Sequence, residues 1–313
     1  EQGASMTKSG TADGTSGIAF SPLKEHLWPA MEGIEQRSNL QDRPPGVTSG
    51  FKDLNLLTSG WSRGDLIILG GATGMGKSAL ALHFAVSAAL ADPQPVAIVT
   101  LEQDEQACVM RMLCAGSRVS TLRVKSGRLR DDDFPPIAMA AGLLNQARIH
   151  ILHSARLFVD QLGTELRQLA QHEGLGLVMV DGLNLLRVDG FAPPATNREQ
   201  EVGIIVRELK ALALELKVPI VATASLSRAV EQRPGKRPML PDLRDSGDVE
   251  NTADVVLFLY RPAYYYGPED GAGNSIENTA ELIVAKHRSG QTGTLDLLWL
   301  PASASFVELV NDD

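Results

Sequence analysis

This chain contains the stretch Gly71-Ala72-Thr73-Gly74-Met75-Gly76-Lys77-Ser78, which fits the phosphate-binding loop pattern G-x-x-x-x-G-K-[ST]. Residues 65–70 before it form an apolar run typical of a buried strand, and residues 78–91 after it are typical of an apolar helix. This context favours a nucleotide site over a glycine-rich turn with an incidental lysine. Loop N–H groups would surround phosphate oxygens, with Lys77 on the β- and γ-phosphates and Ser78 on Mg²⁺.

Buried strands and helices alternate along the rest of the chain. Helical patterns lie at 103–116, 131–145, 158–172 and 198–217, and strand-like runs at 95–102, 177–181, 218–223, 254–260, 279–286, 294–299 and 304–309. Alternation of this kind predicts an α/β fold with a mostly parallel sheet covered by helices on both faces.

The composition is that of an ordinary soluble protein, with 43% hydrophobic and 21% charged residues. No apolar run approaches the roughly 18 residues that span a bilayer and no signal peptide opens the chain, so we expect a cytoplasmic protein with no membrane partner. The net charge of −9 means that any nucleic-acid site must be local. Cys108 and Cys114 are expected to be buried thiols, and His150 and His153 to point to opposite faces of a strand.

The chain before residue 46 differs from the rest. Residues 1–20 are rich in Gly, Ser and Thr and are expected to form a disordered tail. A helix with an apolar stripe follows within 21–45, and Pro29 should kink it or start a second short helix. This helix and its connector are either a local lid or an arm that docks on a neighbouring subunit. Residues 46–313 should form the α/β domain.

Two carboxylates end buried strands at the edge of the sheet where ligands collect. Asp181 is the one expected to order Mg²⁺, rather than to make an ordinary turn. Because Gly182 follows it, the base that orients water for attack on the γ-phosphate must come from elsewhere, and Glu102 is the candidate. A helix-capping role for Glu102 would leave the site without a base.

Three further features have two interpretations each. Lys286 and Arg288 lie two apart at a strand end, either as a pair that reaches a γ-phosphate on a neighbouring chain or as a solvated terminus. The basic residues between 228 and 244 form either a loop that binds a phosphate backbone or a solvated loop. The tyrosines at 264–266 either stack on a base or belong to an ordinary loop.

Together these motifs resemble the C-terminal ATPase domain of the bacterial and phage replicative DNA helicases, the DnaB family, which has a RecA-like P-loop ATPase core and works as a hexameric ring. The resemblance runs from about Gly46 to about Leu309. Besides the phosphate-binding loop, it rests on ordered matches at 46–51, 101–102, 207–213, 231–233, 242–247, 253–254 and 286–290.

The resemblance implies ATP as the nucleotide and a role for each candidate at its site. Glu102 corresponds to the family's catalytic base, and Asp181 to the carboxylate that serves Mg²⁺. Lys286 and Arg288 correspond to the pair that reaches into the neighbouring subunit's ATP site.

The resemblance also implies how an acidic protein binds DNA. Arg244, Asp245 and Gly247 correspond to a loop that lines the central channel and holds the backbone of single-stranded DNA, so that basic and N–H groups face inward. The segment 22–36 corresponds to a linker helix that packs on the adjacent subunit.

Three departures from the family pattern bear on partners and coupling. The family usually carries a longer N-terminal helical domain, so coupling to a primase is in doubt. The family has a Gln after the fourth strand that senses the γ-phosphate, and this chain has Ser225 there. The family also commonly has a Gln three residues after the Mg²⁺ carboxylate, and this chain has Asn184 there. A hydroxyl reaches less far than a carboxamide, so Ser225 calls the coupling of hydrolysis to movement into question.

The sequence therefore predicts a Mg²⁺-dependent ATPase that assembles as a homo-oligomeric ring, translocates on single-stranded DNA and unwinds duplex during replication. A helicase loader is a candidate further partner. The alternatives are a RecA-like recombinase or clock-type ATPase, and a non-motor ATP-dependent assembly or adaptor protein derived from a helicase.

Overall fold

The structure is a computed structural model that describes residues 20–38, 43–190, 198–243 and 246–309. The chain divides into two compact units, residues 1–42 and 43–313, and each is described by itself. All but the last residue of the tail expected at 1–20 falls outside the described residues, and so do Arg244 and Asp245.

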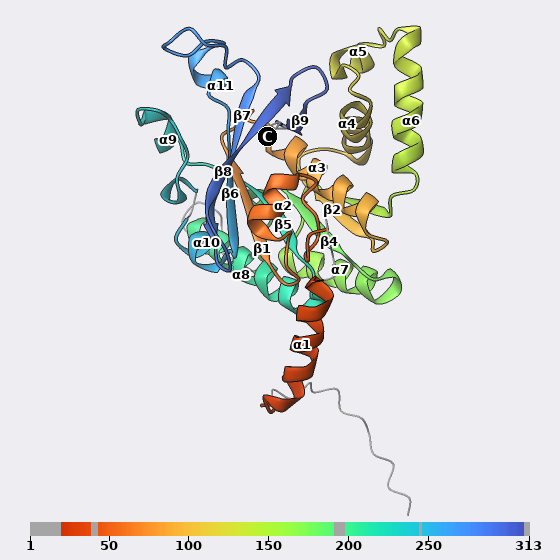
Figure 1. The fold of residues 1–313 in the computed structure, drawn as a ribbon, viewed down its shortest axis with the longest axis vertical. Coiled ribbons are helices and arrows are strands. Elements are labelled where there is room, and N and C mark those ends of the chain that lie inside the picture. Colours follow the sequence, from red (N-terminus) through yellow and green to blue (C-terminus); the bar gives the residue numbers. More distant parts are fainter. Residues whose placement is uncertain (1–19, 39–42, 191–197, 244–245, 310–313) are drawn as a thin grey trace, which may run out of the picture. The chain divides into compact units, whose positions relative to one another are not determined.

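The described part of the first unit holds the helix α1 (Lys24–Ser38) (Figure 1). It runs through Pro29 without interruption, so the alternative that this proline starts a second short helix is wrong. Pro29 lies near the start of α1, where its missing N–H removes only one bond to the first turn. The apolar side chains of Leu27, Met31 and Ile34 are more than half exposed.

The second unit is built on one nine-stranded sheet, which confirms the predicted α/β class with a mostly parallel sheet. The order across the sheet is β3-β2-β4-β5-β1-β6-β7-β8-β9. Six strands are parallel: β3 (Ile149–His153), β2 (Val96–Thr100), β4 (Leu177–Asp181), β5 (Ile220–Ser225), β1 (Leu66–Gly71) and β6 (Val255–Tyr260). Three strands extend the sheet in antiparallel fashion: β7 (Thr279–His287), β8 (Gly293–Leu300) and β9 (Ser305–Glu308).

Helices cover both faces of this sheet, as Figure 1 shows and as the sequence predicts. One face carries α2 (Lys52–Thr58), α3 (Lys77–Ala91) and α4 (Glu105–Ser117), and beyond α4 lie α5 (Thr121–Ser126) and α6 (Phe134–Leu144). The other face carries α7 (Val159–Glu173), α8 (Arg198–Leu216) and α10 (Ser246–Thr252). The short helices α9 (Ala229–Gln232) and α11 (Ala263–Tyr266) lie in connections between strands. None of the described helices is both long and apolar enough to cross a bilayer.

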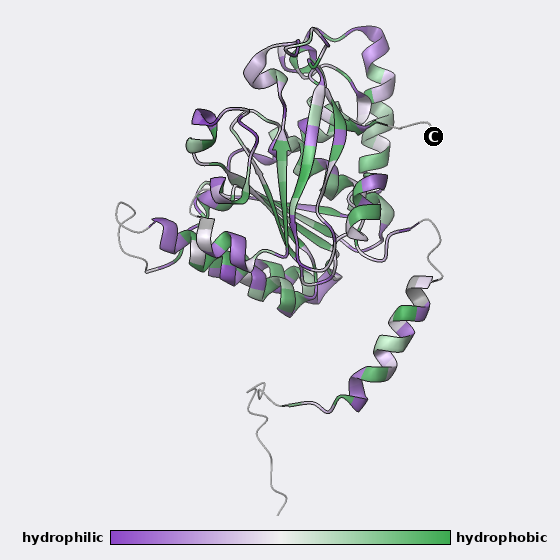
Figure 2. Ribbon diagram, turned by 60° about the vertical axis from the view of Figure 1, so that its left-hand side comes forward, coloured by the Kyte–Doolittle hydropathy of each residue, from purple (hydrophilic) through white to green (hydrophobic). Residues whose placement is uncertain are grey.

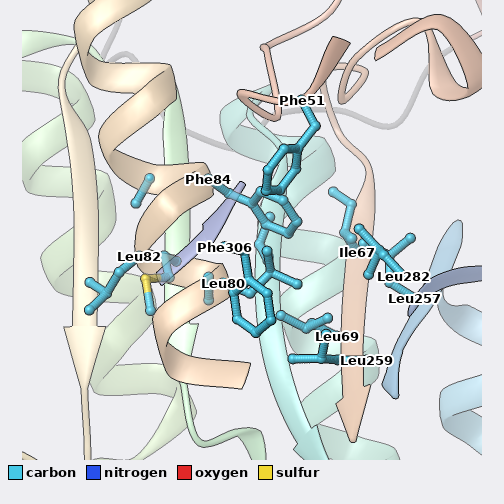
Figure 3. Packing of buried hydrophobic residues seen from close by; sticks show 14 of the residues in the cluster. Phe51, Ile67, Leu69, Leu80, Leu82, Phe84, Leu257, Leu259, Leu282 and Phe306 are labelled. Atoms are coloured by element: carbon cyan, nitrogen blue, oxygen red, sulfur yellow. The ribbon is translucent and has the colours of Figure 1, made fainter. Parts of the chain in front are cut away.

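The core is split by the sheet into two apolar clusters. Along β1, Ile67 and Leu69 pack with α3, where Figure 3 shows them near Leu80 and Phe84. Leu66 and Ile68, which alternate with them, belong to the cluster under α7 and α8. Figure 2 shows the same division as hydrophobic strands between helices whose outer faces are hydrophilic. Because the parallel strands are buried on both faces, they read in the sequence as continuous apolar runs.

Two smaller predictions are also settled by the fold. Cys108 and Cys114 are buried free thiols, as expected. His150 and His153 lie on β3 with different partners, since the ring of His150 contacts Glu173 and that of His153 contacts the carbonyl of Thr100. The two rings therefore point to different neighbours.

Candidate active site

β1 leads into the phosphate-binding loop at Gly71. Gly74 and Gly76 require glycine because their φ angles are +80° and +102°. A Cβ on Gly76 would also lie 2.9 Å from the ring of Phe306. No side chain caps the N-terminus of α3, which begins at Lys77, so its first N–H groups are left for an anion.

Lys77 is held by its own loop. Its Nζ donates to the carbonyl oxygens of Gly71 at 2.8 Å and Ala72 at 3.0 Å. Burial lowers the pKa of Lys77, and the carboxylates of Glu102 and Asp181 oppose that shift. The fold thus brings both predicted carboxylates within electrostatic reach of the lysine.

Asp181 lies at the centre of a hydroxyl cluster. Its Oδ1 accepts hydrogen bonds from Ser78 Oγ at 3.0 Å and from Thr223 Oγ1 at 2.8 Å. Thr223 Oγ1 in turn accepts the N–H of Gly182 at 2.8 Å, which fixes the end of β4 against β5. Asp181 is only 6% exposed, so these bonds decide where its carboxylate points.

The donor set around Asp181 fits Mg²⁺. A carboxylate and a hydroxyl are hard oxygen ligands, and Mg²⁺ usually completes its shell with waters and phosphate oxygens. Among the residues that the structure describes, no group of three or more His, Cys, Asp or Glu side chains could hold a metal. Ser78 and Asp181 are the candidate metal ligands because of their oxygen donors and their place beside the phosphate-binding loop.

These residues line one cleft of about 880 Å³. The phosphate-binding loop and Asp181 form one side, and Glu102, which is exposed just beyond β2, faces the same space. Asn184 and Ser225, the two positions that depart from the family pattern, also line it, and Ser225 N donates to Asn184 Oδ1 at 3.0 Å. The cleft brings together the phosphate-binding loop, the candidate metal ligands and the candidate base.

The cleft is connected to the start of α8 through Asn184. The carbonyl of Asn184 accepts a hydrogen bond from Arg198 Nη2 at 2.6 Å. Arg198 also pairs with Glu201, a carboxylate only 4% exposed that accepts the N–H of Val188 at 3.1 Å. A displacement of Asn184 would therefore shift Arg198 at the beginning of α8.

Lys286 and Arg288 lie outside this cleft. β7 runs antiparallel to β6, and His287 pairs with Val255, so the pair stands at the amino ends of the parallel strands. Both side chains donate to the carbonyl of Asn251, Lys286 at 3.5 Å and Arg288 at 3.0 Å, so they project in the same direction. The two cations cannot reach the phosphate-binding loop of their own chain, because the length of β1 separates them from it.

Three residues at the site were missed by sequence reasoning. Thr223 had a usable signal, because it ends the strand expected at 218–223, at the same edge as Asp181. Arg261 and Trp299 had none: the Arg261 guanidinium lies 4.4 Å from the Trp299 ring centroid, and Nη1 donates to Gly74 O at 3.4 Å. Burial lowers the pKa of Arg261, and Tyr264 opposes the shift. These side chains meet beside the loop only because β6 and β8 are brought there by the sheet.

The basic segment at 228–244 is largely engaged within the chain. Arg233 pairs with Asp242 at 2.5 Å, Arg237 pairs with Glu281, and Lys236 Nζ lies 5.0 Å from the Tyr265 ring centroid. Of the other two tyrosines, Tyr264 lies against the loop, where a Cβ on Gly74 would be 3.2 Å from its ring. Gly247 is exposed in the first turn of α10.

Comparison with known proteins gives a consistent result. Residues 46–308 match the family model described as DnaB-like helicase C terminal domain. The chain is 40% identical over 291 residues to the replicative DNA helicase DnaB of Geobacillus stearothermophilus, and 38% identical over the same length to the replicative DNA helicase DnaC of Bacillus subtilis. Each of these alignments covers 93% of this chain and 63% of the relative, so the chain spans less than two thirds of their length.

Solved structures agree with the sequence relatives. One solved ATPase domain superposes with a TM-score of 0.84 at 32% identity, covering 93% of this chain and all of that domain. A DnaB-like replicative helicase, solved to show its interactions with primase, superposes with a TM-score of 0.80 at 32% identity, covering 94% of this chain and 69% of that one.

Proposed function

This chain belongs to the family of DnaB-like helicase C-terminal domains, and on that premise we propose that it is the ATP-hydrolysing motor of a ring-shaped helicase that moves along single-stranded DNA. The observation that carries the proposal is the division of the site. Lys77, Ser78, Asp181 and Glu102 converge on one cleft, while the cations Lys286 and Arg288 stand at the opposite edge of the sheet. Each ATP site is completed by the neighbouring subunit.

Within one subunit, each residue has a separate task. Loop N–H groups and Lys77 bind the phosphates, and Lys77 exchanges the carbonyls of Gly71 and Ala72 for phosphate oxygens as ATP enters. Ser78 and Asp181 would hold Mg²⁺, which when bound neutralises charge on the phosphates. Glu102 accepts a proton from the attacking water, and its exposure lets water reach it.

Between subunits, Lys286 and Arg288 would contact the γ-phosphate of the neighbour, where positive charge stabilises the transition state. The exposed apolar stripe of α1 would dock on an adjacent subunit and help to close a hexameric ring. Gly247, with Arg244 and Asp245, would hold the DNA backbone in the channel. Single-stranded DNA and further copies of this chain are thus the partners we propose, with the cytoplasm as the place of action.

The first test is the steady-state rate of ATP hydrolysis with and without single-stranded DNA, with Glu102→Gln as the blank. We expect DNA to stimulate a rate that the blank lacks. A slow rate that ignores DNA would contradict the motor and favour the non-motor assembly protein, and Ser225→Gln would then show whether the missing carboxamide is the cause.

The trans assignment needs a separate test. Rings are assembled from Arg288→Ala subunits mixed with Glu102→Gln subunits, and neither variant should turn over alone. If Arg288 acts on the neighbouring subunit, mixed rings should regain turnover, because the intact cleft of an Arg288→Ala subunit then receives Arg288 from an adjacent Glu102→Gln subunit. Mixed rings as inactive as both parents would place Arg288 outside the neighbour's site.

A further inference from the structure

The Lys286 ammonium is fully engaged at the end of α10. Its Nζ lies 2.6 Å from the carbonyl oxygens of both Glu250 and Ala253, and 3.5 Å from that of Asn251. Carbonyls at a helix C-terminus lack intrahelical partners and carry partial negative charge. An ammonium has three N–H donors and no more. Lys286 therefore has no donor to spare for a phosphate while it holds α10.

Arg288 is held differently. Its Nη1 donates to Asp254 Oδ1 at 3.2 Å and its Nη2 to Asn251 O at 3.0 Å. A guanidinium has five donors, and the side chain is 52% exposed, so Arg288 can meet a phosphate without releasing these partners. Asp254 is itself fixed by Leu66 N at 2.8 Å and Lys210 Nζ at 2.6 Å.

An irregularity in β7 aims Lys286 at α10. Val256 pairs with Lys286 but Leu257 pairs with Val284, so Ala285 is an extra residue in the strand. Leu282 and Val284 face the cluster around α3, and strict alternation would send Lys286 to that face as well. The bulge breaks the alternation, and the ammonium meets α10, which packs on the opposite face.

The helix that Lys286 holds also carries the proposed DNA contact. Gly247 lies in the first turn of α10, and Val249 and the following Ala253 are buried in the cluster under α8. α10 is too short to be stable alone, so its contacts with the rest of the chain order it, and the bonds from Lys286 to its last carbonyls are among them. A change at Lys286 should thus reach Gly247 through a single helix.

We propose that Lys286 is shared between two sets of acceptors, the terminal carbonyls of α10 in its own subunit and the γ-phosphate of the neighbour, so that phosphate binding withdraws it from α10 while Arg288 stays in place on Asp254. This rests on the trans role proposed above. Lys286 is then the switch that couples the neighbour's nucleotide state to the DNA-contacting helix. Arg288 contacts the same phosphate without changing its own internal partners.

The intrasubunit half is tested by hydrogen exchange at the amides of α10 and at Ala253, whose N–H donates to Val249 O at 3.1 Å. Lys286→Met keeps the aliphatic stem and removes the donors, so these amides should exchange roughly tenfold faster, as expected for one charge-assisted hydrogen bond lost. Lys52→Met, at the exposed start of α2, is the matched control and should exchange like the wild type. Unchanged exchange in Lys286→Met would overturn the proposal.

The coupling itself is tested in assembled rings of the full chain. With Mg²⁺ and a non-hydrolysable ATP analogue, α10 of the wild type should exchange roughly tenfold faster than with ADP, because Lys286 has left one acceptor set for the other. Lys286→Met should exchange fast in both. Equal exchange with the two nucleotides would overturn the switch if Arg288→Ala still abolishes turnover. Normal turnover in both Lys286→Ala and Arg288→Ala would instead mark the failure of the trans site, and of the switch with it.

Discussion

Each edge of the parallel sheet carries a buried aspartate, but the two carboxylates have different partners. At the carboxyl edge, buried Asp181 accepts hydrogen bonds from the neutral hydroxyls of Ser78 and Thr223. At the amino edge, equally buried Asp254 is paired with two cations, Lys210 at 2.6 Å and Arg288 at 3.2 Å.

The difference indicates which edge can bind a cationic ligand. A carboxylate whose partners are hydroxyls keeps its negative charge for an incoming cation, whereas one held by two cations is already neutralised. The carboxyl edge is therefore an open site, and the amino edge is a closed joint between α10, β1 and β7. A cation from that joint acts elsewhere either with donors that its internal partners do not use, as we propose for Arg288, or by leaving those partners, as we propose for Lys286.

The largest effect should come from Glu102→Gln at the open edge, because an amide cannot accept the proton of the attacking water. We expect ATP turnover to fall by roughly 10²–10⁴-fold, the usual contribution of a general base, with ATP binding retained. Phosphate release and binding of labelled ATP measure the two effects.

Glu105→Gln, an exposed carboxylate in the first turn of α4, is the matched control. It should leave turnover unchanged. If Glu102→Gln behaved like this control, the base would have to be sought outside the carboxyl edge.

The comparison itself is tested by making the same substitution at both edges. Asp254→Asn leaves the partly buried Lys210 without its counter-charge and should lower the free energy of unfolding by about 3 kcal/mol. Asp181→Asn keeps its hydroxyl partners and should change that free energy by less than about 1 kcal/mol. Urea unfolding measures both variants, with the exposed Asp296→Asn as control. Equal losses at Asp181 and Asp254 would show that the two edges do not differ in this way.

A smaller effect is expected from Thr223→Val, which removes the hydroxyl between the two strands of the open edge. The N–H of Gly182 loses its acceptor, and we expect a loss of about 1–2 kcal/mol in the free energy of unfolding. Asp181 also loses a partner that orients it, so half-maximal turnover should require more Mg²⁺. Thr223→Ser keeps the hydroxyl and should restore the Mg²⁺ requirement; a requirement the same in all three proteins would argue against this orienting role.

The last prediction concerns neither edge but the pH range in which the two edges can be compared. His83 on α3 stacks on Phe51 with ring centroids 4.2 Å apart, and burial lowers its pKa to about 4, against a backbone hydrogen bond with Gly50. Below pH 6.5, His83 is protonated in the unfolded chain but stays neutral in the folded chain until the pH approaches 4. The free energy of unfolding should therefore decrease as the pH falls from 6.5 towards 4, by up to about 1.4 kcal/mol per pH unit.

Urea unfolding at a series of pH values measures this slope. His83→Phe preserves the stack on Phe51 and has no titrating group, so its slope should be lower by the contribution of His83. A slope identical to that of the wild type would mean that His83 titrates normally in the folded protein.

Much of the open edge was predictable because its signals are local. The loop pattern, the helix after it and the strand ends at Glu102 and Asp181 can be read within a few residues of sequence. Long elements were also placed closely: the helix expected at 198–217 is α8 at Arg198–Leu216, and the run at 254–260 is β6 at Val255–Tyr260. A helical apolar period over 19 residues leaves little choice of element, and a short continuous apolar run is typical of a buried parallel strand.

The closed edge was predictable only in part. The sequence places Lys286 and Arg288 on one face, but not at α10, because α10 has seven residues and a periodic pattern needs more. The bulge at Ala285 that directs Lys286 leaves no mark in the apolar pattern of β7. The acceptors of this cation come from a segment more than thirty residues away in the chain.

By itself, the sequence determined the phosphate-binding loop and the succession of strands and helices, because glycine spacing, chirality and apolar alternation act between near neighbours. Only the tertiary structure decided which partners the two buried carboxylates have. Asp181 meets Thr223 across 42 residues and Asp254 meets the N–H of Leu66 across 188. Those meetings depend on the order β4-β5-β1-β6, which is set by packing across the whole sheet and by no local pattern.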